Sequence, residues 1–327
     1  MAQHRVLITT SYLEPGDEVH RLLTDSQYAV TYSRPQDRRS PDGLAAALAD
    51  TDAVIAGTEP LTADLIKGAT SLRIIARTGV GYDNIDVDAA ARRGVVVCTT
   101  PGVNRQSVAE LTIGLMLDRA RGIATSSAGV RAGTWVQTSG RELSGSTLGI
   151  VGLGAIGKKV AAVAIALGMT VVAHDPALDT EFAAAHGVRP CTLPELLEQS
   201  DFVTLHIALS PQTYRLIDRD ALALMKPSAH LINTARGGVV DEEALAEALQ
   251  AGQLGGAALD VLESEPLPAT HPLREVPNLL ITPHIGAATV QARSRSGRLA
   301  AAQVIQFLSG KAPDHPVAEA SGQRVRS

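Results

Sequence analysis

Short apolar runs alternate with helix-like segments twice along this chain, and this alternation limits the possible folds more than any other feature. In the first hundred residues, runs rich in β-branched residues occupy 5–10, 29–33, 52–57, 72–78 and 94–100. Segments with helical spacing lie between them, at 18–25, 43–50, 63–70 and 86–94. Apolar strands separated by helices are typical of a parallel sheet covered on both faces. We therefore expect a complete α/β unit here.

The same alternation begins again after a helix predicted over 107–123. The expected strands are 147–152, 170–175, 201–207, 229–235, 256–262 and 278–283, and the expected helices are 157–168, 193–200, 220–226 and 242–252. This pattern predicts a second, larger doubly wound parallel sheet. A last helix, over 288–310, could return to the first unit, and it leaves 311–327 as a polar, mobile tail.

Length and composition fit two domains with aliphatic cores. A chain of 327 residues exceeds what one hydrophobic core usually serves. Hydrophobic residues make up 45% of the chain but aromatic residues only 3%. We therefore expect both cores to consist mainly of Ala, Val, Leu and Ile.

Charge and cysteine content narrow the class of partner. The net charge is −5, and Lys and Arg are scattered, which argues against nucleic acid or an anionic membrane. Cys98 and Cys191 have no metal-ligand spacing, so we expect them to be buried apolar residues and expect no metal. The first residues show no signal-peptide pattern, and no apolar stretch reaches the ~18–20 residues of a membrane span. These features predict a cytoplasmic protein that binds small molecules.

The stretch "IVGLGAIGKKV", residues 150–160, predicts a dinucleotide site. Gly152 ends an expected strand, Gly157 opens an expected helix, and Asp175 ends the next strand 18 residues later. Glycines alone could mark a plain βα turn, but an acidic residue at this spacing is typical of the one that holds the adenosine ribose. The helix start would receive the phosphates. Asp175 would repel a 2′-phosphate, so we expect NAD and not NADP.

Further motifs stand at the ends of the later strands: "INTARGGVVDEEAL" 232–245, "ALDVLESEPLP" 258–268 and "ITPHIGAAT" 281–289. With "RTGVGYDNID" 77–86 and the glycine motif, they give the chain a resemblance to the D-isomer-specific 2-hydroxyacid dehydrogenases over nearly its whole length. The resemblance implies an α/β fold of two doubly wound parallel-sheet domains. A Rossmann NAD-binding domain, 101–289, would be inserted in a smaller flavodoxin-like substrate-binding domain, 1–100 and 290–327. It also implies a homodimer formed through 107–143, which includes Trp135.

The resemblance makes Arg236, Glu265 and His284 the catalytic set, and the chemistry of these side chains suits that role. A guanidinium can grip the carboxylate of a 2-oxo acid and polarise its carbonyl. Histidine can exchange a proton with the substrate oxygen near neutral pH. A carboxylate on the far ring nitrogen fixes the tautomer and stabilises the imidazolium. Without the family, His284 would be interpreted as structural, and nothing would select Glu265 over Glu263.

The resemblance also implies binding contacts. Ala208 replaces a proline common in relatives, a change that a backbone contact from Ile207 would survive. The cofactor contacts are expected at Gly152, Gly154, Ala155, Ile156, Gly157, Asp175, Ile207, Thr234, Ala235, Asp260 and Gly286. The substrate contacts are expected at Arg77, Val80, Gly81, Asn104 and Arg236.

The substrate stays open at this stage. Within the family the chain looks most like phosphoglycerate dehydrogenases without their regulatory domain, which makes 3-phosphoglycerate the first prediction. Many of those relatives have arginine in the segment equivalent to 56–60, where this chain has Glu59, although Arg77, Arg105 or Arg131 could meet a phosphate. Hydroxypyruvate or glyoxylate reduction is the alternative. An NAD-sensing protein like the C-terminal-binding corepressors is a third possibility, because such proteins can keep the catalytic set.

Overall fold

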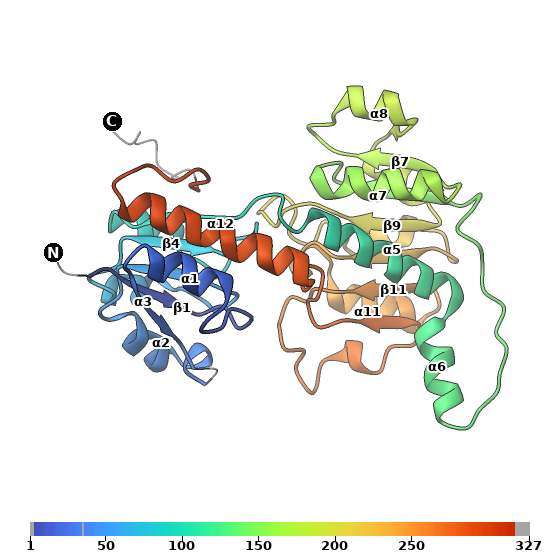
Figure 1. The fold of residues 1–327 in the computed structure, drawn as a ribbon. Helices are drawn as coiled ribbons and strands as arrows, with labels where there is room; N and C mark the ends of the chain where they lie inside the picture. The colour runs from blue at the N-terminus through green and yellow to red at the C-terminus, as the bar shows by residue number, and fades with distance from the viewer. Residues whose placement is uncertain (1–2, 35, 318–327) are drawn as a thin grey trace. The chain divides into compact units, whose positions relative to one another are not determined.

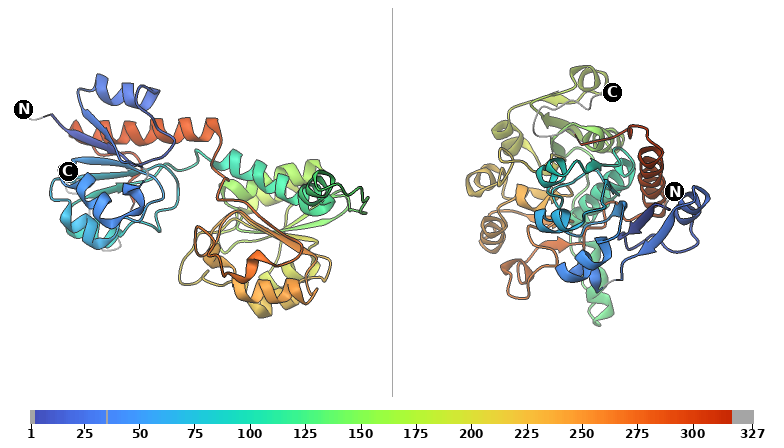
Figure 2. Two further views of the ribbon diagram at one scale, coloured as in Figure 1. Left: turned by 90° about the horizontal axis from the view of Figure 1, so that it is seen from below. Right: turned by 90° about the vertical axis from the view of Figure 1, so that its left-hand side faces the viewer.

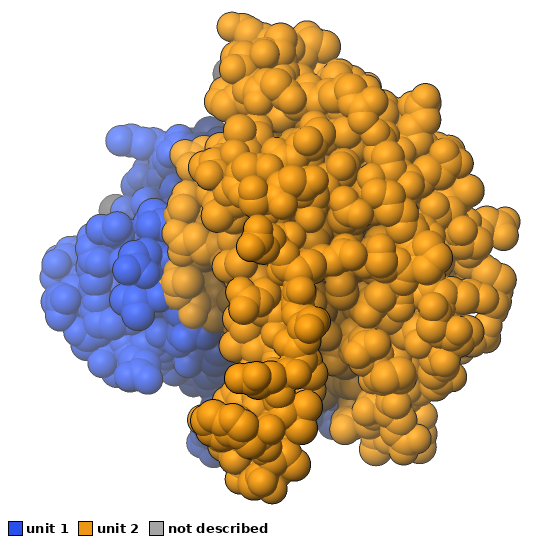
Figure 3. All heavy atoms as spheres, turned by 90° about the vertical axis from the view of Figure 1, so that its right-hand side faces the viewer, with its two compact units in different colours: residues 1–104, 290–327 blue, residues 105–289 orange. Residues whose placement is uncertain are grey.

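The chain forms two compact units in a computed structural model that describes residues 3–34 and 36–317. Unit 1 lies within residues 1–104 and 290–327, and unit 2 spans residues 105–289 (Figure 3). Each unit contains one parallel sheet with helices on both faces (Figure 2). Among the described residues, none of the helices has the length and apolarity to cross a bilayer.

Unit 1 holds a five-stranded parallel sheet in the order β2-β1-β3-β4-β5. Its strands are β1 (Arg5–Ile8), β2 (Ala29–Tyr32), β3 (Ala53–Ala56), β4 (Ile74–Arg77) and β5 (Val96–Cys98). This is the flavodoxin-like strand order, so the fold predicted for this unit is confirmed. One face packs against α1 (Glu18–Asp25) and α12 (Val290–Leu308), and the other against α2 (Pro41–Leu48), α3 (Ala63–Gly68) and α4 (Val87–Arg92). The short turn η1 spans Asp37–Arg39.

The segment after α12 differs from the expected tail. Val317 N donates to Val97 O at 2.8 Å, and Thr99 N donates to His315 O at 3.1 Å. Pro316 forms an antiparallel bridge with Cys98. The prediction of a mobile tail is therefore wrong for 311–317, because backbone groups of the edge strand β5 bind this segment. The remainder, 318–327, lies outside the described residues.

Unit 2 holds a seven-stranded parallel sheet in the order β12-β11-β10-β9-β6-β7-β8 (Figure 1). The strands are β6 (Thr147–Val151), β7 (Thr170–His174), β8 (Arg189–Pro190), β9 (Phe202–Leu205), β10 (His230–Asn233), β11 (Gly256–Leu259) and β12 (Leu279–Ile281). The strand order reverses between β6 and β9. This is the Rossmann order with one added strand, so the predicted fold is confirmed.

The helices of unit 2 include elements that the sequence pattern did not predict. The long helix α5 (Arg105–Arg121) ends at Gly122, whose φ of 61° is left-handed, and α6 (Ile123–Arg131) follows. The one helix predicted over 107–123 is thus too long at its end, and α6, α8 and β8 were missed. The others are α7 (Ala155–Ala166), α8 (Thr180–His186), α9 (Leu193–Gln199), α10 (Arg219–Leu224), η2 (Gly237–Val239), α11 (Glu242–Gln250) and η3 (Pro272–Arg274).

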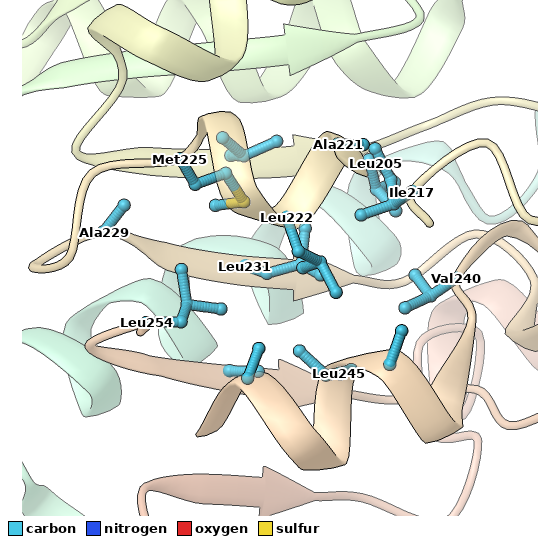
Figure 4. Close-up of a cluster of buried hydrophobic side chains, with 14 of the residues drawn as sticks. Leu205, Ile217, Ala221, Leu222, Met225, Ala229, Leu231, Val240, Leu245 and Leu254 are labelled. Atoms are coloured by element: carbon cyan, nitrogen blue, oxygen red, sulfur yellow. The ribbon is translucent and has the colours of Figure 1, made fainter. Parts of the chain in front are cut away.

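The two faces of the unit 2 sheet carry separate aliphatic cores. Leu205 and Leu231 lie in one buried cluster with Leu222 of α10 and Leu245 of α11 (Figure 4). Side chains of α5 and α7 cover the opposite face. Burial raises the pKa of the Cys98 thiol to about 12, as expected for an apolar residue. Cys191 is only half-buried, so its predicted burial was overstated.

Candidate functional site

Two glycines of the "GLGAIG" turn are required by close packing. Gly152 ends β6 with a φ of 94°, and a Cβ there would overlap the carbonyl oxygen of His206 at the end of β9. A Cβ on Gly157 would overlap the carbonyl oxygen of Gly152. The first glycine therefore lets two strand ends meet where the strand order reverses, and the last lets α7 pack on the strand.

The middle glycine faces open space. Gly154 is the N-cap of α7 and has no side-chain cap, and no described heavy atom outside its own neighbourhood lies within 4 Å of a Cβ built on it. Gly154 and Ala155 are exposed and Ile156 is half-buried. A helix N-terminus left open in this way suits a pyrophosphate, so these residues fit the predicted dinucleotide.

Asp175 lies beside the same turn. Its Oδ2 accepts from Leu153 N at 2.8 Å, and its Oδ1 accepts from Ala177 N at 2.8 Å. Lys158, in the first turns of α7, is paired with Asp179 at 2.5 Å. The hydrogen bond from Lys158 and the backbone N–H of Phe182 hold the pKa of Asp179 below its usual value. A 2′-phosphate at this turn would be repelled by the Asp175 carboxylate, and Lys158 is already paired with Asp179.

Replacing Asp175 by alanine should narrow the preference for NADH over NADPH about tenfold or more, because the repulsion and the ribose hydrogen bonds disappear together. The measurement is kcat/KM with each cofactor for the native protein and the variant. A second change, Asp179→Asn, frees Lys158 and should raise the use of NADPH further. Equal use of both cofactors by the native protein would contradict the role of Asp175.

His284 and Glu265 are brought into contact at the carboxyl edge of the sheet. Glu265 lies in the loop after β11 and His284 in the turn after β12, and Glu265 Oε2 is 2.8 Å from His284 Nδ1. Burial tends to raise the pKa of Glu265, but hydrogen bonds from His284 and Leu262 N–H outweigh it and hold this pKa below its usual value. The two side chains are 39% and 38% exposed, so the pair is accessible to a ligand.

Asp260 fixes the turn that carries His284. Asp260 is 1% exposed, and its carboxylate accepts from Thr282 Oγ1 at 2.6 Å, Ile285 N at 2.8 Å and Gly286 N at 2.7 Å. His284 N donates to the carbonyl oxygen of Asp260 at 2.9 Å. The resemblance implied Asp260 only as a cofactor contact, and this structural task was not predicted. The signal was an aspartate placed directly after an apolar strand.

Arg236 follows β10 in a loop held by Asn233. Asn233 Oδ1 accepts from Ala235 N at 3.0 Å, and its Nδ2 donates to Arg236 O at 2.8 Å. The half-buried Arg236 donates from Nη1 to Ala235 O at 2.7 Å, and its charge helps to lower the pKa of Glu265. A Cβ on Gly237 would overlap the peptide bond between Leu262 and Glu263. The loops that carry Arg236 and Glu265 therefore touch through a glycine.

The remaining predicted cofactor residues lie at the same edge of this sheet. Thr234 Oγ1 is 3.0 Å from Thr112 Oγ1 of α5. Ala235 is 9% exposed and Ile207, after β9, is half-buried. Within the described residues, no group of three or more His, Cys, Asp or Glu side chains is arranged to hold a metal ion.

The predicted substrate residues belong to unit 1, apart from Arg236. Arg77 ends β4 and donates from Nη1 to Thr78 O at 2.6 Å, and Val80 in the following loop is 45% exposed. Gly81 is half-buried. Asn104 Oδ1 is buried without a hydrogen-bond partner among the described residues, which fits a group that awaits a ligand. Their contact with substrate stays a prediction.

Glu59 also lies at the carboxyl edge of the unit 1 sheet. It is 8% exposed, and its Oε1 accepts from Gly57 N at 3.0 Å and from the hydroxyl of Thr9. The position at which the resemblance suggested an arginine therefore carries a buried carboxylate.

The strand order and the glycine turn define an α/β protein with a Rossmann-type nucleotide-binding domain. Residues 113–286 match the profile of the D-isomer specific 2-hydroxyacid dehydrogenase, NAD binding domain. The chain belongs to the D-isomer specific 2-hydroxyacid dehydrogenase family, a family of NAD-dependent oxidoreductases. The resemblance and the predicted cofactor are thereby confirmed.

Similar proteins are named for different substrates. The D-3-phosphoglycerate dehydrogenase of Methanocaldococcus jannaschii is 44% identical over 272 residues, 82% of this chain and 52% of that protein. The rat D-3-phosphoglycerate dehydrogenase is 42% identical over 313 residues, 95% of this chain and 58% of that protein. The chain thus spans about half the length of these curated relatives. The solved structure of a glyoxylate reductase from Paecilomyes thermophila has 30% identity and a TM-score of 0.84, covering 98% of this chain and 100% of that one.

Proposed function

We propose that this chain interconverts a D-2-hydroxy acid and its 2-oxo acid with NAD, and that the substrate is 3-phosphoglycerate. The observation that carries the proposal is the 2.8 Å contact between Glu265 and His284 at the carboxyl edge of a Rossmann sheet. Family membership supports the reaction class. The name shared by the curated relatives supports the substrate.

Each side chain of the set then has a separate task. Arg236 binds the substrate carboxylate and polarises the carbonyl. His284 exchanges a proton with the substrate oxygen through Nε2, because Glu265 occupies Nδ1. Glu265 orients the imidazole and stabilises its charged form. NAD held at Gly154, Ala155, Ile156 and Asp175 would supply or accept the hydride.

A substrate panel tests the proposal. NADH oxidation should be measured with phosphohydroxypyruvate, hydroxypyruvate and glyoxylate, and NAD reduction with 3-phosphoglycerate. Turnover of the phosphorylated acids at the highest kcat/KM supports the proposal. Tight NADH binding without turnover of any acid would contradict it and favour a corepressor-like protein that senses NAD.

Glu59 favours a second candidate, reduction of an acid without phosphate. A carboxylate that is 8% exposed at this edge of unit 1 would repel a phosphate dianion nearby. Higher kcat/KM with hydroxypyruvate or glyoxylate would favour this candidate. In that case Glu59→Gln should shift the preference toward phosphohydroxypyruvate.

Replacing Glu265 by glutamine should move the pH profiles of both directions to lower pH, because it removes the interaction with His284 that lowers the pKa of Glu265. Reduction needs protonated His284 and oxidation needs neutral His284, so reduction falls and oxidation rises with increasing pH. Without the carboxylate the imidazolium is less favoured, and both curves move the same way. The measurement is kcat/KM against pH, with deuterated NADH to show that chemistry limits the rate.

The matched control for this experiment is Glu263→Gln. Its carboxylate accepts from Tyr214 Oη at 2.9 Å and is the second acidic group of the same short motif. Its substitution should leave the profiles in place. Profiles that do not move in Glu265→Gln would assign the proton to another group.

We also propose that two copies associate through α6 and the segment that follows it. Every residue of α6 is described, and none is buried. Ile123 and Val130 on α6 are 55% and 51% exposed, and Trp135 and Val136 are 82% and 71% exposed. Exposed apolar residues within one segment support the proposed interface.

A double substitution, Trp135→Ser with Val136→Ser, should weaken this dimer at least tenfold, as measured by sedimentation over a range of concentrations. The exposed apolar residues removed are those expected to anchor the interface. Val290, which is 82% exposed in unit 1, provides the control Val290→Ser, expected to stay dimeric. A native protein that sediments as a monomer at every concentration would refute the assembly.

A further inference from the structure

Glu242 is a buried acidic residue to which the reaction described above gives no task. It is the first residue of α11, after the N-cap Asp241, and its side chain is 4% exposed. A buried carboxylate is costly unless hydrogen bonds satisfy it. Its neighbour Glu243 is exposed. The partners of Glu242 therefore indicate what it does.

One oxygen of Glu242 binds the loop that carries Glu265. Glu242 Oε1 accepts from Glu263 N at 2.6 Å, and Oε2 lies 3.2 Å from His271 Nε2. The preceding backbone group, Leu262 N, donates to Glu265 Oε1 at 3.0 Å. Two successive N–H groups thus bind two carboxylates, one on a helix and one in contact with His284.

The side-chain contacts of Glu263 itself are at the surface. The Glu263 side chain accepts from Tyr214 Oη at 2.9 Å and lies 3.9 Å from Arg215 Nη2, but the side chains of this ion pair are each 40% exposed. Exposed pairs contribute little, whereas a buried hydrogen bond to a charged group contributes more. Gly237 packs against the peptide bond between Leu262 and Glu263. Glu242 and Gly237 therefore restrain the same point of the chain.

We propose that Glu242 is a positioning residue that fixes the Leu262–Glu263 peptide bond and thereby keeps Glu265 on Nδ1 of His284. The proposal rests on the proposed function, which gives Glu265 and His284 the proton transfer. His271 orients the Glu242 carboxylate, since its Nε2 meets Oε2 while its Nδ1 accepts from Leu273 N at 3.3 Å.

Replacing Glu242 by alanine should lower kcat on the order of 10²-fold, the effect of a displacement of about 1 Å at a reacting group. The Kd for NADH should stay within about threefold, because the glycine turn and Asp175 are untouched. Glu242→Gln keeps an oxygen acceptor for Glu263 N but turns its NH2 group toward the donor Nε2 of His271, so it should lose activity, but less than the alanine variant. Glu243→Ala, one residue along the same helix, is the matched control and should behave like the native protein.

A double-mutant cycle separates positioning from general destabilisation. If Glu242 acts only through Glu265, then adding Glu242→Ala to Glu265→Gln should lower kcat by less than about threefold relative to Glu265→Gln alone. The proposal is overturned if the kcat losses of the two single variants multiply in the double variant. It is also overturned if Glu243→Ala loses as much kcat as Glu242→Ala. If the alanine variant does not fold, Glu242→Asp, which shortens the side chain, replaces it in the cycle.

A readout without turnover distinguishes this proposal from the proposed function. The imidazole signal of His284 in ¹³C-labelled protein, assigned through its loss in His284→Asn, reports the contact with Glu265. In Glu242→Ala this signal should move toward its position in Glu265→Gln. An unmoved signal overturns the positioning role even if the native protein turns over. A moved signal in a protein without turnover supports positioning while the proposed reaction fails.

Discussion

Replacing His284 by asparagine should lower kcat in both directions on the order of 10²–10⁴-fold, the usual contribution of a general acid–base group. The Kd for NADH should stay nearly unchanged, because the histidine acts on the substrate oxygen. Asparagine is the suitable replacement because His284 has a φ of 53°. Asparagine tolerates this left-handed conformation, whereas alanine would add backbone strain to the loss of the imidazole.

The turn that carries His284 should keep its conformation in His284→Asn. Asp260 holds it through Thr282 Oγ1, Ile285 N and Gly286 N, none of which belongs to the imidazole. The melting temperature of His284→Asn should therefore stay close to the native value. His186→Asn on the exposed end of α8 is the control and should keep native kcat. Activity of His284→Asn within tenfold of native would remove His284 from the proton transfer.

The two sheets could be predicted because their strands are marked by short-range patterns. Each buried strand is a short apolar run, and the turn from Gly152 to Gly157 has a spacing set by one βαβ unit. The end of α5 was less visible, since only the left-handed φ of 61° at Gly122 separates it from α6. The segment 311–317 could not be predicted, because it is bound by backbone groups of β5, which carry no sequence signal.

The candidate site shows the same limit for side chains. The sequence alone could not choose between Glu263 and Glu265. In the structure Glu265 meets His284 at 2.8 Å and Glu263 meets Tyr214 at 2.9 Å. Glu242 was missed as well, because its partner Glu263 lies in a loop that follows another strand. Contacts between loops depend on strand order, and local patterns do not report them.

Replacing Gly237 by alanine should have a large effect, and replacing its neighbour Gly238 should not, because the two glycines have different surroundings. A Cβ on Gly237 would overlap the Leu262–Glu263 peptide bond. The atoms nearest to a Cβ on Gly238 would be side-chain atoms of Leu209 and Tyr214, at 3.4 Å. Gly237→Ala must therefore displace backbone, whereas Gly238→Ala fills space at ordinary contact distance.

Gly237→Ala should therefore lower the free energy of unfolding by about 1–3 kcal/mol and kcat on the order of 10²-fold, while Gly238→Ala stays near native in both. The loss of kcat follows because the displaced peptide bond carries the Glu263 N–H that donates to Glu242, and because it belongs to Leu262, whose own N–H donates to Glu265. Urea unfolding and steady-state kinetics of the two variants are the measurements. Equal effects in both variants would mean that the contact between the two loops does not constrain the site. A loss of stability in Gly237→Ala without a loss of kcat would mean that the loop relaxes while Glu265 keeps its place on His284, and the mechanism would then not depend on this packing.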